Sequence, residues 1–205
     1  MSQPDEPLQL TEVRNSSASL TALDHAQIAE LVYEAGREFY DCFAMTHDRL
    51  LEAIVPQLVR PGTELSGTHA LRSGGDVEGI VSTIDANDLR NAQTVSVAHL
   101  LRELTASERE PAMARLSEHS AVIEPSPPEG VYVARFAVAR ERRGHGLGQR
   151  LLAWVCDTFG DQTLTLHISR ANESAIGLYE GHGFRRLSDA DFGFPAYVRQ
   201  PPVDR

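Results

Sequence analysis

Lysine is absent from this chain of 205 residues, and all 19 of its basic residues are arginine. The absence excludes a Walker A phosphate loop, a Schiff-base catalyst and a protein-kinase ATP site, because each of them needs a lysine. No stretch approaches the roughly 18 consecutive apolar residues of a membrane span, so we expect no membrane segment. Residues 1–13 are acidic and polar, unlike a signal peptide, which favours a cytoplasmic protein.

Patterns for disulfides and metal sites are equally sparse. The two cysteines, Cys42 and Cys156, lie far apart in apolar helical patterns, so we expect buried free thiols rather than a disulfide. The 8 histidines have neither cysteine partners nor the H-E-x-x-H spacing of a zinc site. We therefore expect no bound metal.

The net charge of −10 is unevenly distributed. Residues 1–130 hold 21 acidic and 9 basic residues, whereas residues 131–205 hold 8 acidic and 10 basic ones. The acidity of the whole chain argues against nucleic-acid binding. The slightly basic part suits an anionic ligand, and the acidic part either attracts a cationic partner or simply keeps the surface soluble.

The length predicts one globular domain over residues 1–205, with a frayed tail at 1–7. The hydrophobic periodicity of the first 130 residues predicts mainly helices around one hairpin. The expected elements are a strand at Leu8–Val13, a helix from Thr21 or Asp24 to about Phe43, a helix at His47–Leu58, strands at Glu64–Arg72 and Val77–Ile84, and a helical stretch at 87–120 that Pro111 divides or restarts.

After residue 130, strands and helices alternate. The expected elements are a strand at Val131–Val138, a helix at Gly148–Phe159, a strand at Thr163–Ile168, a helix at Asn172–Glu180, and a closing pair of strands at Phe184–Leu187 and Ala196–Val198. This order predicts a mixed α/β layered fold.

Three alternate glycines, Gly144, Gly146 and Gly148, stand between the strand at 131–138 and the following helix. Glycines let a ligand approach the backbone, and amides at a helix N-terminus bind phosphate, so this turn suits a pyrophosphate. The spacing lacks the third glycine of the dinucleotide fingerprint G-x-G-x-x-G. A tight structural turn without a ligand is the alternative.

Residues 136–148, FAVARERRGHGLG, resemble the acyl-CoA-binding motif of the GNAT superfamily of N-acetyltransferases. Arg143, Gly146 and Gly148 fill the positions of its core pattern. A second stretch, from Asn172 to Phe184, is similar to the family signature N-x-x-A-x-x-L-Y-E-x-x-G-F. The resemblance covers about residues 130–188.

The resemblance implies a largely antiparallel mixed sheet with one splayed parallel pair of strands and helices on both faces. Residues 130–188 would form the acyl-CoA-binding core of a single acyltransferase domain, and residues 87–125 a helical insertion longer than a minimal member needs. Arg140 stands where many members have proline, a departure that affects the shape of the backbone at the entry into the turn. Because of this insertion, the resemblance does not assign the residues of the acceptor site.

The resemblance also assigns roles to the cofactor-binding residues. The backbone of Phe136, Ala137 and Val138 would bind the pantetheine arm of acetyl-CoA. Asn172 would bind the same arm or a bridging water, or would simply cap a helix. The amides of the turn would hold the pyrophosphate; its residues are Arg143, Gly144, His145, Gly146, Leu147 and Gly148.

Tyr179 is the catalytic candidate, because a phenol near the thioester sulfur can protonate the leaving thiolate. Its alternative role is packing on the sheet. A general base must take a proton from the attacking amine. Glu141, Asp85, His167 and water remain open for this role, and His167 is equally suited to a structural position.

We therefore expect an N-acetyltransferase that moves an acetyl group from acetyl-CoA to a primary amine by direct attack in a ternary complex. The acceptor would be a cationic small molecule or a peptide N-terminus. The alternatives are a non-catalytic acyl-CoA-binding sensor or scaffold, and an enzyme that transfers a longer acyl group. We expect no nucleic-acid or membrane partner, and a homodimer is possible.

Overall fold

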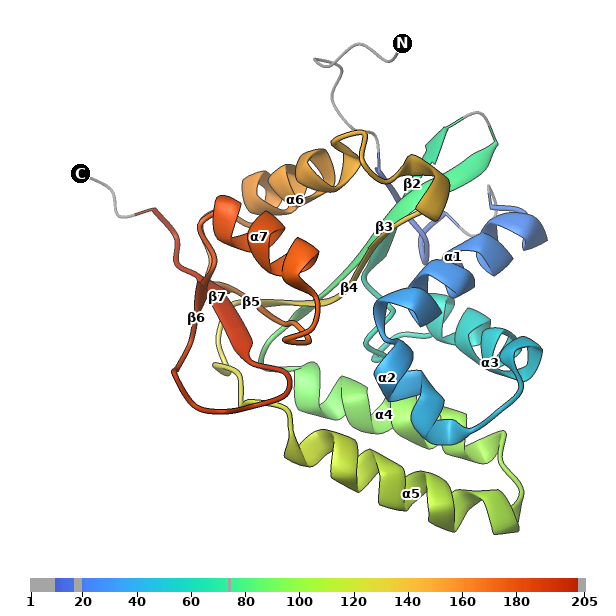
Figure 1. Cartoon of the computed structure of the whole chain (residues 1–205). Helices are drawn as coiled ribbons and strands as arrows, with labels where there is room; N and C mark the ends of the chain where they lie inside the picture. Colours follow the sequence, from blue (N-terminus) through green and yellow to red (C-terminus); the bar gives the residue numbers. More distant parts are fainter. Residues whose placement is uncertain (1–9, 17–19, 74, 203–205) are drawn as a thin grey trace.

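A mixed sheet crosses the centre of the molecule and carries helices on both faces (Figure 1). The computed structural model describes residues 10–16, 20–73 and 75–202, so the tail expected at 1–7 lies outside the described residues. The sheet has seven strands in the order β1-β2-β3-β4-β5-β7-β6. They are β1 (Leu10–Glu12), β2 (Thr68–Ser73), β3 (Asp76–Asp85), β4 (Val131–Val138), β5 (Leu164–His167), β6 (Arg185–Arg186) and β7 (Ala196–Arg199).

The strand pairs are antiparallel except β4 and β5, which are parallel, so the predicted fold class is confirmed. The helices occupy the positions that the hydrophobic stripes predict, apart from two boundaries described below. They are α1 (Ala22–Ala35), α2 (Arg37–Tyr40), α3 (His47–Val59), α4 (Leu89–Arg102), α5 (Ala106–Ala121), α6 (Leu147–Thr158) and α7 (Glu173–Gly181), with short 3₁₀ turns η1 (Asp41–Phe43) and η2 (Arg140–Arg142).

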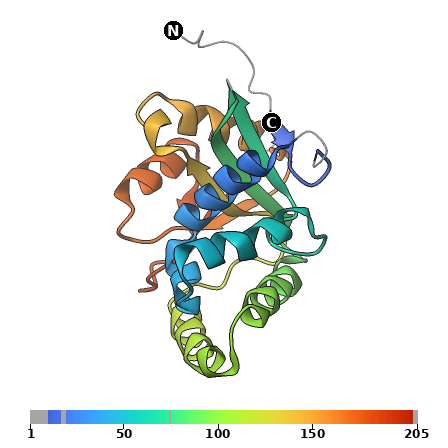
Figure 2. The same cartoon turned by 90° about the vertical axis from the view of Figure 1, so that its right-hand side faces the viewer.

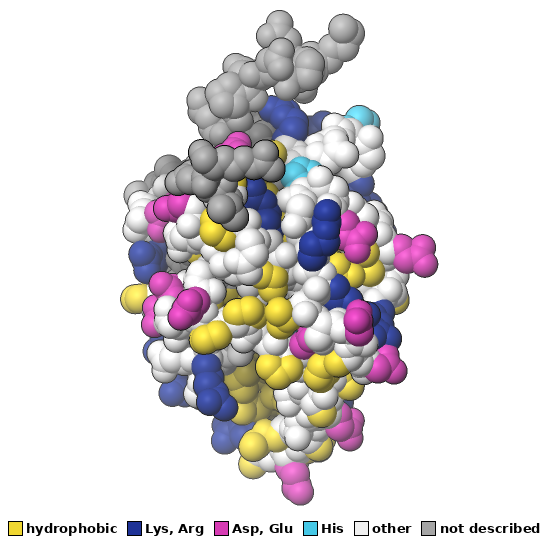
Figure 3. Space-filling model, turned by 90° about the vertical axis from the view of Figure 1, so that its left-hand side faces the viewer, with side chains coloured by type: hydrophobic (Ala, Val, Ile, Leu, Met, Phe, Trp, Pro, Cys, Tyr) yellow, Lys and Arg dark blue, Asp and Glu magenta, His cyan; other side chains and the backbone are white. Residues whose placement is uncertain are grey.

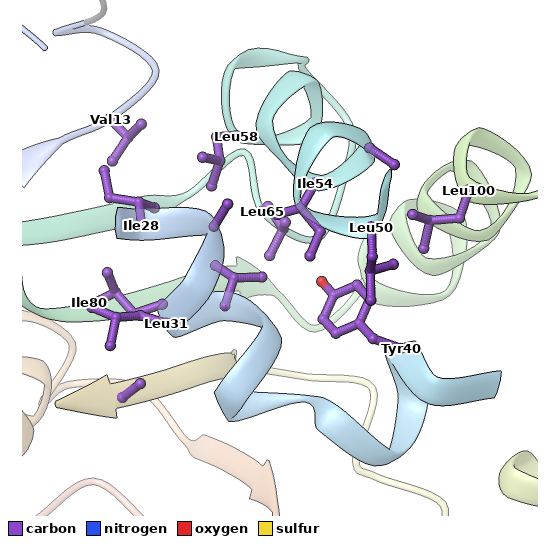
Figure 4. Close-up of a cluster of buried hydrophobic side chains, with 14 of the residues drawn as sticks. Val13, Ile28, Leu31, Tyr40, Leu50, Ile54, Leu58, Leu65, Ile80 and Leu100 are labelled. Atoms are coloured by element: carbon purple, nitrogen blue, oxygen red, sulfur yellow. The ribbon is translucent and has the colours of Figure 1, made fainter. Parts of the chain in front are cut away.

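Two hydrophobic clusters hold the layers together, one on each face of the sheet. On the first face, Ile28 of α1 and Ile54 of α3 pack with Ile80 of β3, and all three side chains are fully buried (Figure 4). On the second face, Leu151 and Leu152 of α6 belong to a cluster that also holds side chains of β4, β5 and α7. The sheet therefore separates two compartments that meet only where its strands part.

A bulge in β4 decides which side chains face which compartment. Ser82 of β3 pairs with Arg135 and Thr83 pairs with Val133, so Ala134 is left without a partner. The extra residue reverses the alternation of the strand. Val133 and Phe136 consequently belong to the same cluster on the α6 face, whereas the guanidinium of Arg135 lies over the Phe39 ring of α2 on the opposite face.

The helix expected from Thr21 to Phe43 is interrupted at Gly36, so this prediction was wrong in its second half. α1 ends there, and α2 starts in a new direction. A Cβ atom on Gly36 would lie 2.8 Å from Nε of Arg135. A larger residue at position 36 would therefore require the Arg135 side chain to move, although the two residues are about 100 positions apart in the sequence.

The prediction that Pro111 separates two helices was also wrong. The break lies before Thr105, which forms a capping box with Glu108 and starts α5. Pro111 falls inside α5 at an exposed position, where the missing amide costs one hydrogen bond. The capping box is the stronger signal for a helix start.

Gly67 is expected to be essential for stability, because a Cβ atom there would lie 2.1 Å from the carbonyl oxygen of Thr83, beside the bulge. Gly67→Ala should lower the free energy of unfolding by about 1–3 kcal/mol, measured by chemical denaturation. Gly177→Ala, inside α7 with nothing within 4 Å, is the matched control and should be stabilising by about 0.5–1 kcal/mol. A Gly67→Ala variant as stable as the parent would contradict the close approach.

Candidate functional site

A cleft opens where β4 and β5 diverge. The two strands pair only at Val131 with Leu164 and at Tyr132 with Thr165, and beyond these pairs they separate (Figure 1). The cleft has a volume of about 1930 Å³ and is lined by residues from both faces of the sheet. Ligand pockets usually measure about 300–1,000 Å³, so there is room for two substrates.

The edge of β4 that faces the cleft carries backbone groups that no neighbouring strand uses. Gly79 and Val138 are opposite each other, and Ala139 donates its amide hydrogen to Glu78 (2.9 Å), so this is a non-hydrogen-bonded pair. In such a pair the amide and carbonyl of Val138 point away from β3, and alternation gives Phe136 the same direction. The amides of Phe136 and Val138 and the carbonyl of Phe136 can bond an extended, amide-containing ligand arm, whereas the carbonyl of Val138 already accepts from Arg143.

The glycine turn lies at one end of the cleft and leads into α6. Gly144 (φ +78°) and Gly146 (φ +77°) adopt the left-handed conformation, and Gly146 is the N-cap of the helix. In the described part of the chain, no hydrogen bond is donated by the backbone amides from Gly144 to Gly148. Amides of this kind at a helix N-terminus form a phosphate-binding cradle.

The arginines around the turn are paired with carboxylates of the N-terminal half. Arg143 donates to the carbonyl of Val138 (2.9 Å) and to Glu34 of α1 (2.5 Å), so its side chain joins the turn to β4 and α1. Arg142 pairs with Glu78 at 2.8 Å. His145 lies in the same turn, where its ring contacts the carbonyl of Arg143 at 2.8 Å. Affinity for an anion at this turn therefore depends mainly on the backbone amides.

Asn172 lies in the wall of the cleft as the N-cap of α7. Its side-chain oxygen accepts a hydrogen bond from the amide of Ala175 at 3.1 Å. The capping role that the sequence offered as an alternative is thus present. The amide group of the same side chain keeps its donors for a ligand.

Tyr179 of α7 belongs to the hydrophobic cluster on the α6 face of the sheet. Its ring makes edge contacts with Phe136 of β4 at 5.8 Å and with Phe184 at 5.6 Å, and the side chain lines the cleft. Burial raises the pKa of Tyr179 above its usual value near 10. The phenol is therefore protonated at neutral pH, as an acid must be before it donates.

Two of the candidate bases lie outside the cleft. Asp85 is exposed at the end of β3, where its carboxylate accepts from both the backbone and the side-chain amide of Asn87 at 2.9 Å. Glu141 is exposed in η2 and is not among the residues that line the cleft. Neither carboxylate faces the space in which an amine would meet a thioester.

His167 does line the cleft, but both ring nitrogens are engaged. Nε2 lies 2.6 Å from the carbonyl oxygen of Glu124, which can only accept, so Nε2 carries the hydrogen. Nδ1 therefore accepts from the hydroxyl of Tyr132 at 2.8 Å. Burial holds the pKa of His167 below its usual value of 6.5. This geometry is that of a neutral structural histidine.

The sequence analysis missed a carboxylate that the structure places inside the cleft. Glu64, expected at the start of a strand, lies in the turn before β2, and it is 4 % exposed. Its carboxylate faces Arg135 at 3.6 Å and accepts from Gln93 of α4 at 3.3 Å. No local pattern marks this site, because its three residues come from separate parts of the chain.

Comparison with known proteins agrees with this arrangement. Residues 112–184 match the model of the acetyltransferase (GNAT) family. The chain has the GNAT fold. An N-acetyltransferase from Staphylococcus aureus Mu50 superposes with a TM-score of 0.67 at 17% identity, over 85% of this chain and 94% of that one.

Two further relatives extend the comparison. A structure titled as histone acetyltransferase HPA2 and related acetyltransferase, from Corynebacterium glutamicum, has a TM-score of 0.57 at 17% identity, over 98% of this chain and 99% of that one. An uncharacterised protein of Mycobacterium leprae is 37% identical over 71 residues, which cover 35% of this chain and 20% of that protein. The GNAT resemblance drawn from the two motifs is thus confirmed. The alignment with the Mycobacterium leprae protein spans only a fifth of that protein's length. No helix in the described ranges is long and apolar enough to cross a membrane.

His167 should make folding stability depend on pH. Its pKa is lowered in the folded protein, so below about pH 6.5 the unfolded chain binds more protons and stability falls as the pH falls. His167→Gln keeps an amide donor for Glu124 and an acceptor for Tyr132, and should flatten this decline in denaturation curves between pH 7.5 and 5. His119, whose pKa burial also lowers, contributes equally to both proteins. An unchanged pH dependence in the variant would contradict the neutral assignment of His167.

Proposed function

We propose that this protein is an acetyl-CoA-dependent N-acetyltransferase that acts on a primary amine. The observation that carries the proposal is one continuous cleft with three features in order: the amide cradle at Gly144–Gly148, the open edge of β4 at Phe136–Val138, and the protonated phenol of Tyr179. A pyrophosphate, an amide-rich pantetheine arm and a leaving thiolate have the matching chemistry in the same order.

The proposed reaction is direct transfer in a ternary complex. The amine nitrogen attacks the acetyl carbonyl carbon, the bond from that carbon to sulfur breaks, and the thiolate takes the proton of Tyr179. The proton lost by the amine passes to water, and Tyr179 regains its own from solvent. A relay through Cys156 does not fit, because its thiol is buried in the core beneath α6 and burial raises its pKa.

The activity is tested by measuring free thiol released from acetyl-CoA in the presence of a panel of primary amines. Release that depends on an amine supports the enzyme. Tight CoA binding without release by any amine would instead favour the acyl-CoA sensor. Palmitoyl-CoA in place of acetyl-CoA separates the transferase of longer acyl groups from the proposed one.

Tyr179→Phe should lower kcat by about 10²-fold and leave the Kd for CoA within about twofold, because the variant loses only the donated proton. Tyr197→Phe is the matched control: Tyr197 is equally buried in the same cluster but does not line the cleft. The raised pKa of Tyr179 also predicts no loss of kcat from phenol ionisation up to pH 10. An unchanged kcat in the Tyr179→Phe variant would remove the acid role.

Gly146→Ala should weaken CoA binding by about tenfold, because its positive φ costs an L-residue about 1–2 kcal/mol and the turn relaxes away from the cradle geometry. Gly62→Ala is the control, since Gly62 has φ +78° and equally open surroundings in a turn remote from the cleft. Isothermal titration with CoA compares the two variants. Equal affinities would show that the cradle does not bind the pyrophosphate.

A further inference from the structure

The cleft also extends into a groove between α4 and α5. One wall carries Val97 and Leu101 of α4, and the other carries Met113 and Leu116 of α5. On the face in Figure 3, where the β6–β7 loop lies in front of these helices, hydrophobic side chains gather in the lower half of the molecule. We call this space, between residues 89–101 and 113–123, the α4–α5 groove.

The groove lies between two helices that are joined near their connection, where Arg109 of α5 donates to the carbonyl of Leu101 in α4 at 3.0 Å, and that have separate anchors elsewhere. Arg115 of α5 donates to the carbonyl of Cys42 in η1 at 2.7 Å, whereas Ser96 of α4 accepts from the amide of Glu64 at 3.1 Å. Figure 2 shows the two helices diverging from their short connection. Their apolar stripes therefore face the groove and are partly exposed, and Met113 is 58 % exposed.

Three rings line one side of the groove near the sheet. His119 of α5 stands between Phe39 of α2, at 6.4 Å, and Phe194 of the loop before β7, at 5.1 Å. All three side chains line the cleft. Such a row provides edges and faces for a further aromatic ring.

A carboxylate lies at the inner end of the groove. Glu64 forms a buried ion pair with Arg135, and the 3.6 Å between its Oε2 atom and the guanidinium is too long for a hydrogen bond, so this oxygen can still accept one. Glu64 and Arg135 line the same cleft as Tyr179. The groove thus combines apolar walls, aromatic rings and the buried carboxylate of Glu64, and the exposed carboxylate of Glu38, next to Phe39, also lines the cleft.

We infer that the acceptor is an arylalkylamine: a primary amine whose aromatic group lies in the α4–α5 groove and whose nitrogen is directed by Glu64 toward the thioester. The inference rests on the proposed function, since it names the substrate class of that same cleft. Polyamines and aminoglycosides are the competing acceptors, since Glu38 in the same lining can receive a second positive charge, but the walls at Val97, Leu101, Met113 and Leu116 are better matched to a ring.

The test compares 2-phenylethylamine, ethylamine and spermidine as acceptors, by thiol release from acetyl-CoA. We expect kcat/KM for 2-phenylethylamine to exceed that for ethylamine by about 30-fold, from burial of the ring. Titration of 2-phenylethylamine into the protein–CoA complex measures binding independently of turnover. Higher kcat/KM for ethylamine or spermidine than for 2-phenylethylamine would overturn the inference and leave the proposed function intact.

The two proposals fail in distinguishable ways. If 2-phenylethylamine binds the CoA complex and no amine releases thiol, the transfer activity fails and the groove remains an arylamine site. If 2-phenylethylamine neither binds nor reacts, the groove assignment is overturned, and thiol release with other amines decides the proposed function separately.

Variants on the two walls test whether the preference for 2-phenylethylamine over ethylamine arises in the α4–α5 groove. In Met113→Gln the new side chain has nearly the shape of methionine but is polar. The double variant Met113→Gln, Val97→Thr should lower kcat/KM for 2-phenylethylamine about tenfold and leave kcat/KM for ethylamine within about twofold. Met113→Leu keeps an apolar wall and is the matched control. An equal loss for both amines, or none for either, would show that the groove does not hold the ring.

Discussion

The cleft depends on the hydrogen bond between Tyr132 and His167, which lies where β4 and β5 begin to separate. It joins β4 to β5 immediately beyond their last backbone pair, with 2.8 Å between the phenol oxygen and Nδ1. His167 is held in turn by the carbonyl of Glu124, whose buried carboxylate accepts from the amide of Ala196 in β7 (2.8 Å) and from Ser188. Side chains thus replace the backbone ladder, and the inner edge of β4 stays open to a ligand.

The uneven distribution of charge along the sequence has a structural role, because acidic residues of the N-terminal part pair with arginines of the C-terminal part. Three acidic residues of the N-terminal part form such pairs. Glu34 pairs with Arg143, Glu78 with Arg142, and Glu64 with Arg135. The two halves of the chain are thereby joined across the cleft, and the arginines that surround the cradle are neutralised before any anion arrives.

The sequence predicted those parts of the structure that local patterns determine. β4 has the predicted bounds Val131–Val138, and the glycine turn and the cap at Asn172 lie in the cleft. The motif residues are close in sequence, and each is part of an element with clear periodicity, which is why they could be found.

The rest depends on contacts between distant residues. Gly36 at the helix break lies against the Arg135 side chain, and the bulge beside the Ser82 pair turns Arg135 toward α2. Glu64 becomes a site residue only when α4 brings Gln93 beside it. Asp85 and Glu141 are polar residues next to motif strands, a pattern that does not say which way a side chain points.

The attachment of α4 and α5 has a consequence for how such a protein diversifies. Residues 89–121 form an excursion between β3 and β4 that contributes no strand to the sheet and no residue to the phosphate cradle. Arg49 of α3 holds the turn of this excursion from outside, through the carbonyl of Glu103 and the carboxylate of Glu108. Changes along the helical pair therefore leave the glycine turn and the edge of β4 unaltered, so one wall of the cleft can vary in sequence while the opposite wall stays the same.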